Sequence, residues 1–324
     1  MSKSVDLIGV PFDLGGGRSG ARGGPEAFRR SGMIPALERA HISVRYQNIQ
    51  EQSECPGVFD SLRKPRGRVY YEKEVAAVTR LVGARTFASL RLGHLPVVLG
   101  GDHSLSIGSI GAMLHPDILR GRTLGLVWID AHYDAHTHLT THSHRAHGLP
   151  LATLLGYGPR SLMPRGRKIR VETASGRSIR QAPRSLLSPG NVLHIGAGTD
   201  NCESEEDEFF ETHGIPRFSR AYLQKEGWGS LWDALCALLC VDLLWVSLDL
   251  DAIDGSFAPG VYYRNPDGLL REELLLLASR IADSGKLCGV DIMEYNPKAE
   301  EFDVQGNSLT AGLATEFLLQ ILRT

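Results

Sequence analysis

The amino-acid sequence predicts an α/β fold of three layers, in which a mostly parallel β-sheet is covered by helices on both faces. Two observations predict it. Apolar runs recur along the chain and are apolar throughout, which is typical of strands buried on both faces. Helical patterns lie between several of these runs, and strands that alternate with helices form parallel sheets. Because no long linker interrupts the 324 residues, we treat residues 1–324 as a single domain.

The individual elements follow from hydrophobic periodicity and from the glycine and polar residues that bound each run. Seven runs are predicted to be strands, and in chain order they are residues 5–10, 42–46, 95–99, 124–129, 192–195, 243–250 and 287–292. Five segments are predicted to be helices, namely residues 71–92, 105–113, 231–240, 271–282 and 309–322. The first two helices flank the third strand, and the third and fourth helices precede the sixth and seventh strands. The chain therefore consists of repeated strand–helix units.

Two segments are predicted to be irregular. Residues 52–68 form a polar stretch that contains proline and glycine. Residues 157–190 carry eight arginine or lysine residues against a single acid, Glu172. We interpret this basic stretch as a solvated surface excursion, and the alternatives are a docking patch for an anionic partner or a lid over a site.

Composition and charge exclude several classes of protein. The sequence is 42% hydrophobic and 22% charged, near the average for a soluble globular enzyme, so the chain is not wholly disordered. A net charge of −2 gives no electrostatic reason to expect nucleic acid or an anionic membrane as a partner. The most apolar neighbourhood, residues 231–250, is interrupted by Asp233, Asp242 and Asp249. We therefore expect no membrane span.

Cysteine usage and the N-terminus favour a cytoplasmic protein. The five cysteines are scattered and form no Cys-x-x-Cys pair, which is typical of reduced thiols. Cys236 and Cys240 lie four residues apart in an apolar helical pattern, so we expect them in the core. The first residues show no secretory signal of a basic segment followed by a long apolar segment.

Aspartate and histidine residues follow three of the predicted strands, where the carboxyl ends of parallel strands meet at one edge of a sheet. They are His103, then Asp130, His132 and Asp134, and then Asp249 and Asp251. A spacing of two places alternate side chains on one face of an extended chain. Each could instead be a helix cap or a satisfied polar group, but burying six such groups without a cation would be costly.

The chemistry of these six residues predicts a metal centre. Four carboxylates and two imidazoles form an oxygen-rich set, which suits Mn²⁺ better than a thiolate-type zinc site. Four carboxylates also exceed what one cation needs. Two cations bridged by carboxylate would use them all, so we expect two Mn²⁺ per chain.

The same residues carry a resemblance to a known family. Residues 100–104 (Gly-Gly-Asp-His-Ser), 128–134 (Trp-Ile-Asp-Ala-His-Tyr-Asp) and 247–254 (Ser-Leu-Asp-Leu-Asp-Ala-Ile-Asp) resemble the three metal signatures of the arginase (ureohydrolase) family. Residues 9–13 and 23–25 are similar to its N-terminal strand and loop, and residues 291–297 to its C-terminal glutamate motif. The resemblance spans almost the whole chain. It implies a parallel sheet of about eight strands, a binuclear Mn²⁺ site, hydrolysis of a guanidinium to urea and an amine, and a homotrimer or hexamer.

The resemblance also implies roles for single residues. One ion would be held by His103, Asp130, Asp134 and Asp249, and the other by Asp130, His132, Asp249 and Asp251. Two Mn²⁺ ions would supply hydroxide near neutral pH, which Asp134 would steer. Glu294 would pair with the guanidinium, and His147 would pass a proton to the leaving nitrogen. The alternative for His147 is an ordinary surface histidine in a histidine-rich loop.

Substrate contacts are implied at five further positions: His136, Thr141, Ser143, Asp200 and Asn201. The first three match positions that bind the α-carboxylate in arginases, although a histidine stands where asparagine is usual. The last two fall in the segment where arginases carry the acidic residues that bind the α-amino group of the substrate. The neighbouring acidic run, residues 203–208, is expected to be the solvated start of a helix and no substrate clamp.

The identity of the substrate has an alternative. Residues 259–261 (Pro-Gly-Val) are more similar to formimidoylglutamase, a sister hydrolase, which usually carries an arginine for the distal carboxylate of its substrate. Arg145 or Arg264 could replace that arginine here, and Tyr262 and Tyr263 would narrow the pocket. The sequence thus predicts an L-arginine hydrolase. The alternatives are a ureohydrolase with another guanidino or formimino substrate and a metal-binding relative without activity.

Overall fold

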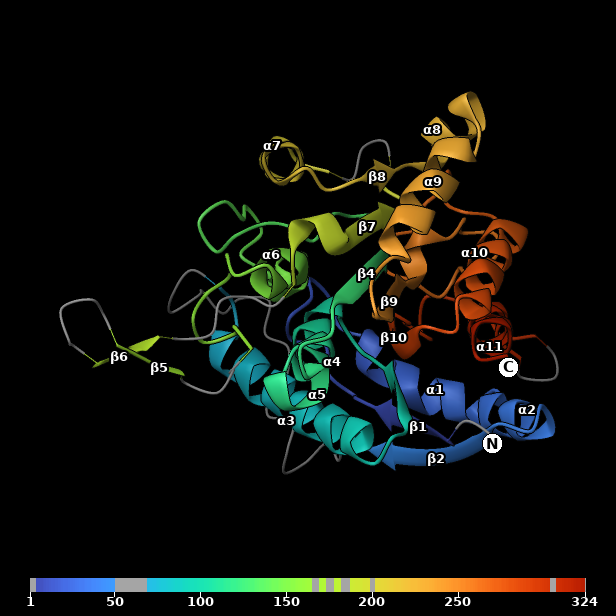
Figure 1. Ribbon diagram of the computed structural model, residues 1–324. Coiled ribbons are helices and arrows are strands. Elements are labelled where there is room, and N and C mark those ends of the chain that lie inside the picture. The colour runs from blue at the N-terminus through green and yellow to red at the C-terminus, as the bar shows by residue number, and fades with distance from the viewer. Residues whose placement is uncertain are drawn as a thin grey trace.

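One sheet of eight parallel strands forms the centre of the part of the chain that the structure describes (Figure 1). The computed structural model describes residues 4–49, 69–164, 169–172, 178–181, 187–198, 202–303 and 307–323. In chain order the strands are β1 (Ser4–Gly9), β2 (Ser43–Asn48), β3 (Leu95–Leu99), β4 (Leu124–Ile129), β7 (Val192–Ile195), β8 (Arg217–Phe218), β9 (Leu243–Asp249) and β10 (Leu287–Met293). Their order across the sheet is β2-β1-β3-β10-β9-β4-β7-β8. All seven predicted strands are confirmed, and the two-residue edge strand β8 was too short to show a periodic pattern.

Helices cover both faces of this sheet, which confirms the three-layer α/β prediction. One face carries α1 (Gly24–Arg30), α2 (Met33–Arg39), α8 (Arg220–Glu226), α9 (Gly229–Leu238), α10 (Arg271–Asp283) and α11 (Leu309–Ile321). The other carries α3 (Glu72–Arg91), α4 (Ser106–Met113), α5 (Pro116–Leu119), α6 (Pro150–Leu154) and α7 (Ser204–His213). Successive strand residues alternate between the two cores. In β4, for example, Val127 packs with the first group of helices and Trp128 with the second.

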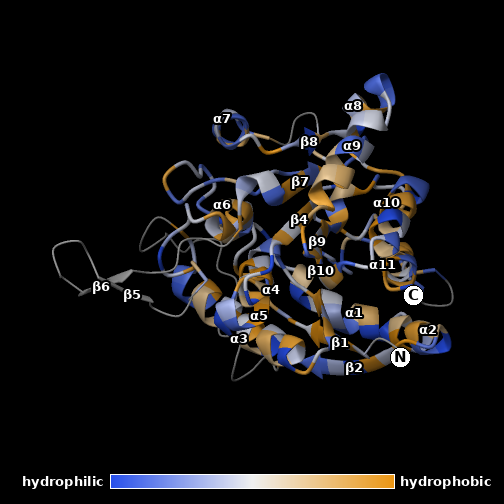
Figure 2. Cartoon of the chain, in the orientation of Figure 1, coloured by the Kyte–Doolittle hydropathy of each residue, from blue (hydrophilic) through white to orange (hydrophobic). Residues whose placement is uncertain are grey.

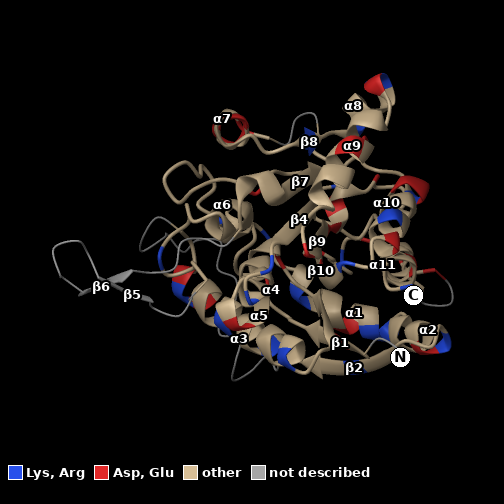
Figure 3. Ribbon diagram, in the orientation of Figure 1, with Lys and Arg blue, Asp and Glu red and all other residues tan. Residues whose placement is uncertain are grey.

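Hydropathy and charge follow the same layering. Figure 2 shows hydrophobic residues concentrated in the central strands, whereas the surrounding helices carry both hydrophobic and hydrophilic residues. In Figure 3 acidic and basic residues are interspersed along the outer helices. None of the described helices is both long enough and apolar enough to span a bilayer.

Two expectations from the sequence need correction. The segment 157–190 contains an antiparallel pair, β5 (Ile169–Glu172) and β6 (Ser178–Gln181), which Figure 1 draws apart from the main sheet. The interpretation of that segment as a solvated surface excursion, with a docking patch or a lid as the alternatives, stays a prediction. The predicted loop at 52–68 lies outside the described residues. Cys236 and Cys240 are exposed and not in the core. The buried side of α9 is formed by Leu231, Leu235 and Leu238, and both cysteines lie outside that stripe.

Candidate metal centre

The candidate centre lies where four neighbouring strands end. In the sheet, β3, β10, β9 and β4 are adjacent in that order, and each is parallel to the next. His103 lies four residues after β3, Asp130 directly follows β4, Asp249 closes β9 and Glu294 directly follows β10. Side chains that are far apart in the sequence therefore meet at the carboxyl edge of one sheet.

Local backbone geometry holds these side chains in place. Asp249 accepts a hydrogen bond from the amide of Asp251 at 2.9 Å, and Asp130 accepts one from the amide of His132 at 2.8 Å. Asp134 and Glu294 adopt left-handed backbone angles, with φ of 50° and 63°. Non-glycine residues rarely adopt such angles, and they persist where the surrounding structure fixes them, commonly at functional sites.

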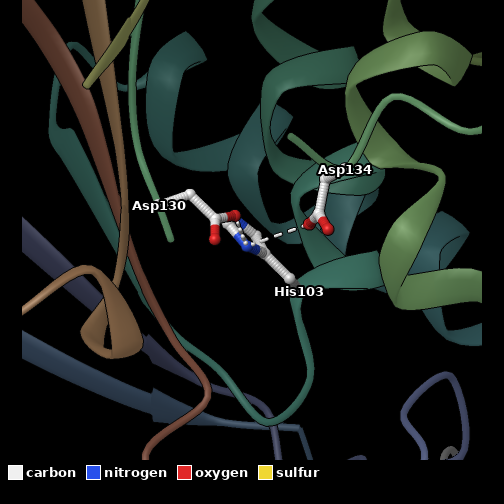
Figure 4. Close-up of side chains that lie close together, drawn as sticks. All are labelled: His103, Asp130 and Asp134. Atoms are coloured by element: carbon white, nitrogen blue, oxygen red, sulfur yellow. Dashed lines mark ion pairs between the residues drawn. The ribbon is translucent and has the colours of Figure 1, made fainter. Parts of the chain in front are cut away.

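A first group of ligand-type side chains surrounds His103 (Figure 4). Its Nδ1 atom lies 3.0 Å from Asp130 Oδ2, 3.2 Å from Asp134 Oδ2 and 3.0 Å from Asp249 Oδ2. All four side chains are buried. One nitrogen and three carboxylates thus converge from the ends of three strands.

A second group lies next to the first and shares Asp130 with it. His132 Nδ1 lies 3.1 Å from Asp251 Oδ2 and 3.6 Å from Asp130 Oδ1. Asp130 therefore directs one oxygen at His103 and the other at His132. We call the six residues of the two groups the metal floor. They are His103, Asp130, His132, Asp134, Asp249 and Asp251.

The electrostatics of the metal floor favour bound cations. Burial, followed by the charge of Asp130, raises the pKa of Asp134 well above its usual range. Burial and the charge of Asp251 do the same to the pKa of Asp249. Burial alone would lower the pKa of His103, but hydrogen bonds to Asp130 and Asp249 raise it well above the usual value. Four crowded carboxylates therefore need more positive charge than two imidazoles provide, and this oxygen-rich set fits divalent cations.

Residues behind His103 fix its orientation. Its Nε2 atom lies 3.0 Å from Ser247 Oγ, and that hydroxyl donates to Asp291 Oδ2 at 3.4 Å. The ring stacks on Trp128 with the centroids 4.3 Å apart, and Trp128 Nε1 donates to Asp130 Oδ2 at 2.9 Å. Such outer contacts orient metal ligands. The sequence showed these residues inside strands but gave no signal of their supporting role.

A cavity of about 330 Å³ opens above the metal floor. His147 and Glu294 form one wall, with His147 Nδ1 3.3 Å from Glu294 Oε1. The same carboxylate oxygen accepts a hydrogen bond from the amide of His103 at 2.9 Å. The mouth is surrounded by seven further side chains, which we call the rim: Arg18, His136, Ser143, Glu203, Glu206, Tyr262 and Tyr263.

The acidic start of α7 was expected to be solvated, but part of it is buried against the cavity. The helix begins at Ser204, as an acidic helix start, but Glu206 is buried and lines the cavity together with Glu203. Glu206 accepts a hydrogen bond from the amide of Ala135 at 3.0 Å, and burial raises its pKa. His136 Nε2 lies 3.4 Å from Glu203 Oε2. Glu203 and Glu206 form a capping box, which marks the start of the helix but gives no sign in the sequence that the tertiary fold buries Glu206.

Comparison with known proteins agrees with this geometry. The model of the arginase family matches residues 3–322. This chain belongs to the arginase family. It is 31% identical to the arginase of Bacillus caldovelox over 304 residues, which are 92% of this chain and 93% of that relative. The fold matches the native structure of arginase from the same organism with a TM-score of 0.82, at 28% identity and 99% coverage of both chains.

The same fold also occurs in a hydrolase with a different name. The formimidoylglutamase of Bacillus subtilis matches with a TM-score of 0.71, at 20% identity, over 99% of this chain and 86% of the other. At that identity the likeness shows the fold alone. The chain is therefore an arginase-family hydrolase with a candidate metal centre, and its substrate must be argued from the rim.

Of the five substrate contacts that the resemblance to arginases implied, the structure describes three. His136 and Ser143 line the cavity, and Thr141 is buried beside them with its Oγ1 3.4 Å from Ser143 Oγ. Asp200 and Asn201 lie outside the described residues.

Arg145 and Arg264, the two arginines that could bind the distal carboxylate of formimidoylglutamate, contact other groups. Arg264 Nε donates to the carbonyl of Pro259 at 3.0 Å, and the Arg145 guanidinium lies 4.3 Å from the ring centroid of Tyr70. Neither is among the described residues that line the cavity, so the structure gives no support to that possibility. Tyr262 and Tyr263 do line its mouth, as the narrowing hypothesis requires.

Proposed function

We propose that this protein hydrolyses L-arginine to L-ornithine and urea with two Mn²⁺ ions held by the metal floor. The observation that supports it most is the pair of adjacent ligand groups that share Asp130 beneath a cavity walled by Glu294 and His147. A binuclear site can supply hydroxide to attack a stable guanidinium, and a neighbouring carboxylate and imidazole can bind the cation and carry a proton.

The six residues of the metal floor are the proposed ligands. His103, Asp130, Asp134 and Asp249 would hold one ion, and Asp130, His132, Asp249 and Asp251 the other. When bound, two such ions supply hydroxide near neutral pH from a water molecule whose pKa they lower. The oxygen-rich donor set is the reason to propose Mn²⁺ over a zinc site rich in thiolates.

Three side chains of this protein complete the reaction. Glu294 accepts charge-assisted hydrogen bonds from the guanidinium and holds its carbon over the metal floor. Asp134, at the edge of the floor, orients the attacking oxygen. His147 protonates the leaving nitrogen, because an imidazole exchanges protons near neutral pH. Water is thereby added across one C–N bond, which yields urea and the amine of ornithine.

Formimidoylglutamate is the weaker candidate because of charge at the rim. It carries two carboxylates and no free ammonium, so Arg18, the single arginine or lysine among the described rim residues, could offset only one of them against Glu203 and Glu206. No arginine follows Asp134 within its signature. The same two acids suit the ammonium of an α-amino acid.

The setting of the enzyme is also a proposal. We propose that residues 1–324 form one domain, because strands from both ends of the chain enter one sheet. We further propose a homotrimer or hexamer in the cytoplasm. The four described cysteines are free, which agrees with a reducing compartment.

Urea release from L-arginine tests the proposed function. The protein is treated with a chelator, reloaded with Mn²⁺ and assayed, and its metal content is measured on the same sample. We expect two Mn²⁺ per chain and turnover that depends on them. A full complement of metal with no urea would overturn the proposed reaction, and one ion or none per chain would overturn the binuclear centre.

A further inference from the structure

Arg18 is a cation at the rim of an otherwise acidic cavity. Among the described residues that line the cavity, it is the single arginine or lysine. The rim carries Glu203 and Glu206, the wall carries Glu294, and the metal floor adds Asp134, Asp249 and Asp251. A substrate that carries a carboxylate would be repelled by these acids unless a cation offset them.

A series of ring contacts links the exposed side chain of Arg18 to the metal floor. Its guanidinium carbon lies 3.9 Å from the ring centroid of Tyr262. Tyr262 meets Tyr263 with centroids 4.3 Å apart, and Tyr263 meets the ring of His132 at 5.5 Å. Stacking covers one face of a guanidinium and leaves its in-plane N–H groups to donate.

The loop that carries Arg18 is also tied to the catalytic wall. The carbonyl of Gly15 accepts a hydrogen bond from the amide of His147 at 3.0 Å. The amide of Gly15 donates to Asp102 Oδ2 at 2.9 Å, one residue before His103. The loop that leads to Arg18 is therefore anchored beside both the metal floor and His147.

From these contacts we infer that Arg18 is a specificity residue that binds the α-carboxylate of the substrate at the rim. A guanidinium donates two parallel hydrogen bonds to a carboxylate, which gives both affinity and orientation. The enzyme would thereby prefer L-arginine to agmatine, the same guanidine without a carboxylate. This inference rests on the proposed function, because it assigns one end of the proposed substrate.

The test measures the activity of matched variants of the full-length, Mn²⁺-loaded enzyme with each of two substrates, L-arginine and agmatine. Arg18→Gln removes the charge, and Arg18→Lys keeps it without the paired donors. Arg29→Gln is the control, because Arg29 pairs with Glu26 on the exposed side of α1. We expect Arg18→Gln to lower kcat/KM for L-arginine about tenfold and to leave that for agmatine unchanged. Arg18→Lys should lie between the wild type and Arg18→Gln.

Binding without turnover supplies an independent readout. Calorimetry should show that Arg18→Gln weakens L-ornithine about tenfold and leaves 1,4-diaminobutane unaffected. Equal losses for both ligands, or no loss for either, would overturn the inference, and thermal unfolding checks that the variant is folded. If the wild type releases no urea from L-arginine, the proposed function fails. The ornithine and diaminobutane comparison still decides whether Arg18 binds a carboxylate.

Discussion

The metal floor and the rim of the same cavity are built in different ways. The floor consists of side chains at the ends of adjacent strands, and most of them are buried. The rim consists of side chains from four separate segments of the chain, and several of them, such as Glu203 and Tyr263, are about half exposed. We therefore propose that the sheet positions the groups that carry out the reaction, whereas the surrounding segments determine which substrate is bound.

The largest effect is expected from changes in the shared floor. Asp130→Asn removes a carboxylate that contacts both histidines of the floor, and Asp249→Asn removes one beside His103. Because loss of even a supporting residue costs about 10–100-fold in metal affinity, we expect more than about 100-fold for these ligands. Urea release should fall to background. Metal titration and the urea assay measure both effects.

Asp254→Asn is the matched control, since Asp254 lies in the same signature but accepts a hydrogen bond from the amide of Ser256 instead. It should retain both ions. If Asp130→Asn kept its metal content, the floor would not be a metal centre.

A substitution in the wall of the cavity should impair catalysis without affecting metal binding. Glu294→Gln keeps the shape of the side chain but removes the charge that would pair with the guanidinium in the proposed reaction. We expect kcat to fall about 10²–10³-fold with metal content unchanged, as for loss of a key electrostatic contact in an active site. Steady-state kinetics and metal analysis on one sample decide it. Loss of metal together with activity would make Glu294 part of the floor.

A smaller effect is expected at His147, since water can partly replace a proton carrier. His147→Asn should lower kcat about a hundredfold and leave the metal content intact. Added imidazole should restore part of the rate. An unchanged kcat would mean that His147 is an ordinary histidine of the loop.

The residues of the floor could be predicted from the sequence, whereas those of the rim could be predicted only in part, because the floor depends on local patterns and the rim on how distant loops pack. Apolar runs followed by Asp-x-His-x-Asp and Asp-x-Asp place ligands at strand ends, and parallel pairing then brings those ends together. The stacking of Arg18 on Tyr262 depends on how distant loops meet, which no local pattern shows. Glu206 belonged to an acidic run that resembles a solvated helix start, yet the tertiary fold buries it.

The short elements show the same limit. The strand β8 has two residues, so it offers no periodicity, and the pair β5–β6 lies in a stretch dominated by arginine. Cys236 lies on the exposed side of α9 and Cys240 lies beyond its end at Leu238, so a spacing of four in an apolar stretch showed neither which side of the helix is buried nor where the helix ends.

The smallest effect on catalysis is expected outside both regions. Asp6 in β1 is buried, which by itself would raise its pKa, but hydrogen bonds from Arg45 and His94 lower the pKa below its usual value. A carboxyl with a lowered folded-state pKa stabilises the fold above its unfolded pKa, near 4, and loses that contribution as the pH falls. Asp6→Asn should cost roughly 1–3 kcal/mol at pH 7 and progressively less below pH 4.

Chemical denaturation at several pH values measures this cost. The kcat of Asp6→Asn should match that of the wild type where both are folded. A cost that did not shrink in acid would mean that the ion pairs of Asp6 are not what stabilises this part of the sheet.

The central claim is that the floor sets the reaction and the rim selects L-arginine. It is tested most directly by kcat/KM of the Mn²⁺-loaded enzyme for L-arginine, agmatine, guanidinobutyrate and formimidoylglutamate measured side by side. We predict that L-arginine gives the highest value, although with weaker binding than in a typical arginase, because a histidine replaces the usual asparagine at position 136. Much faster turnover of formimidoylglutamate or agmatine would contradict the account of the rim, and no turnover of any of the four would contradict the proposed enzyme.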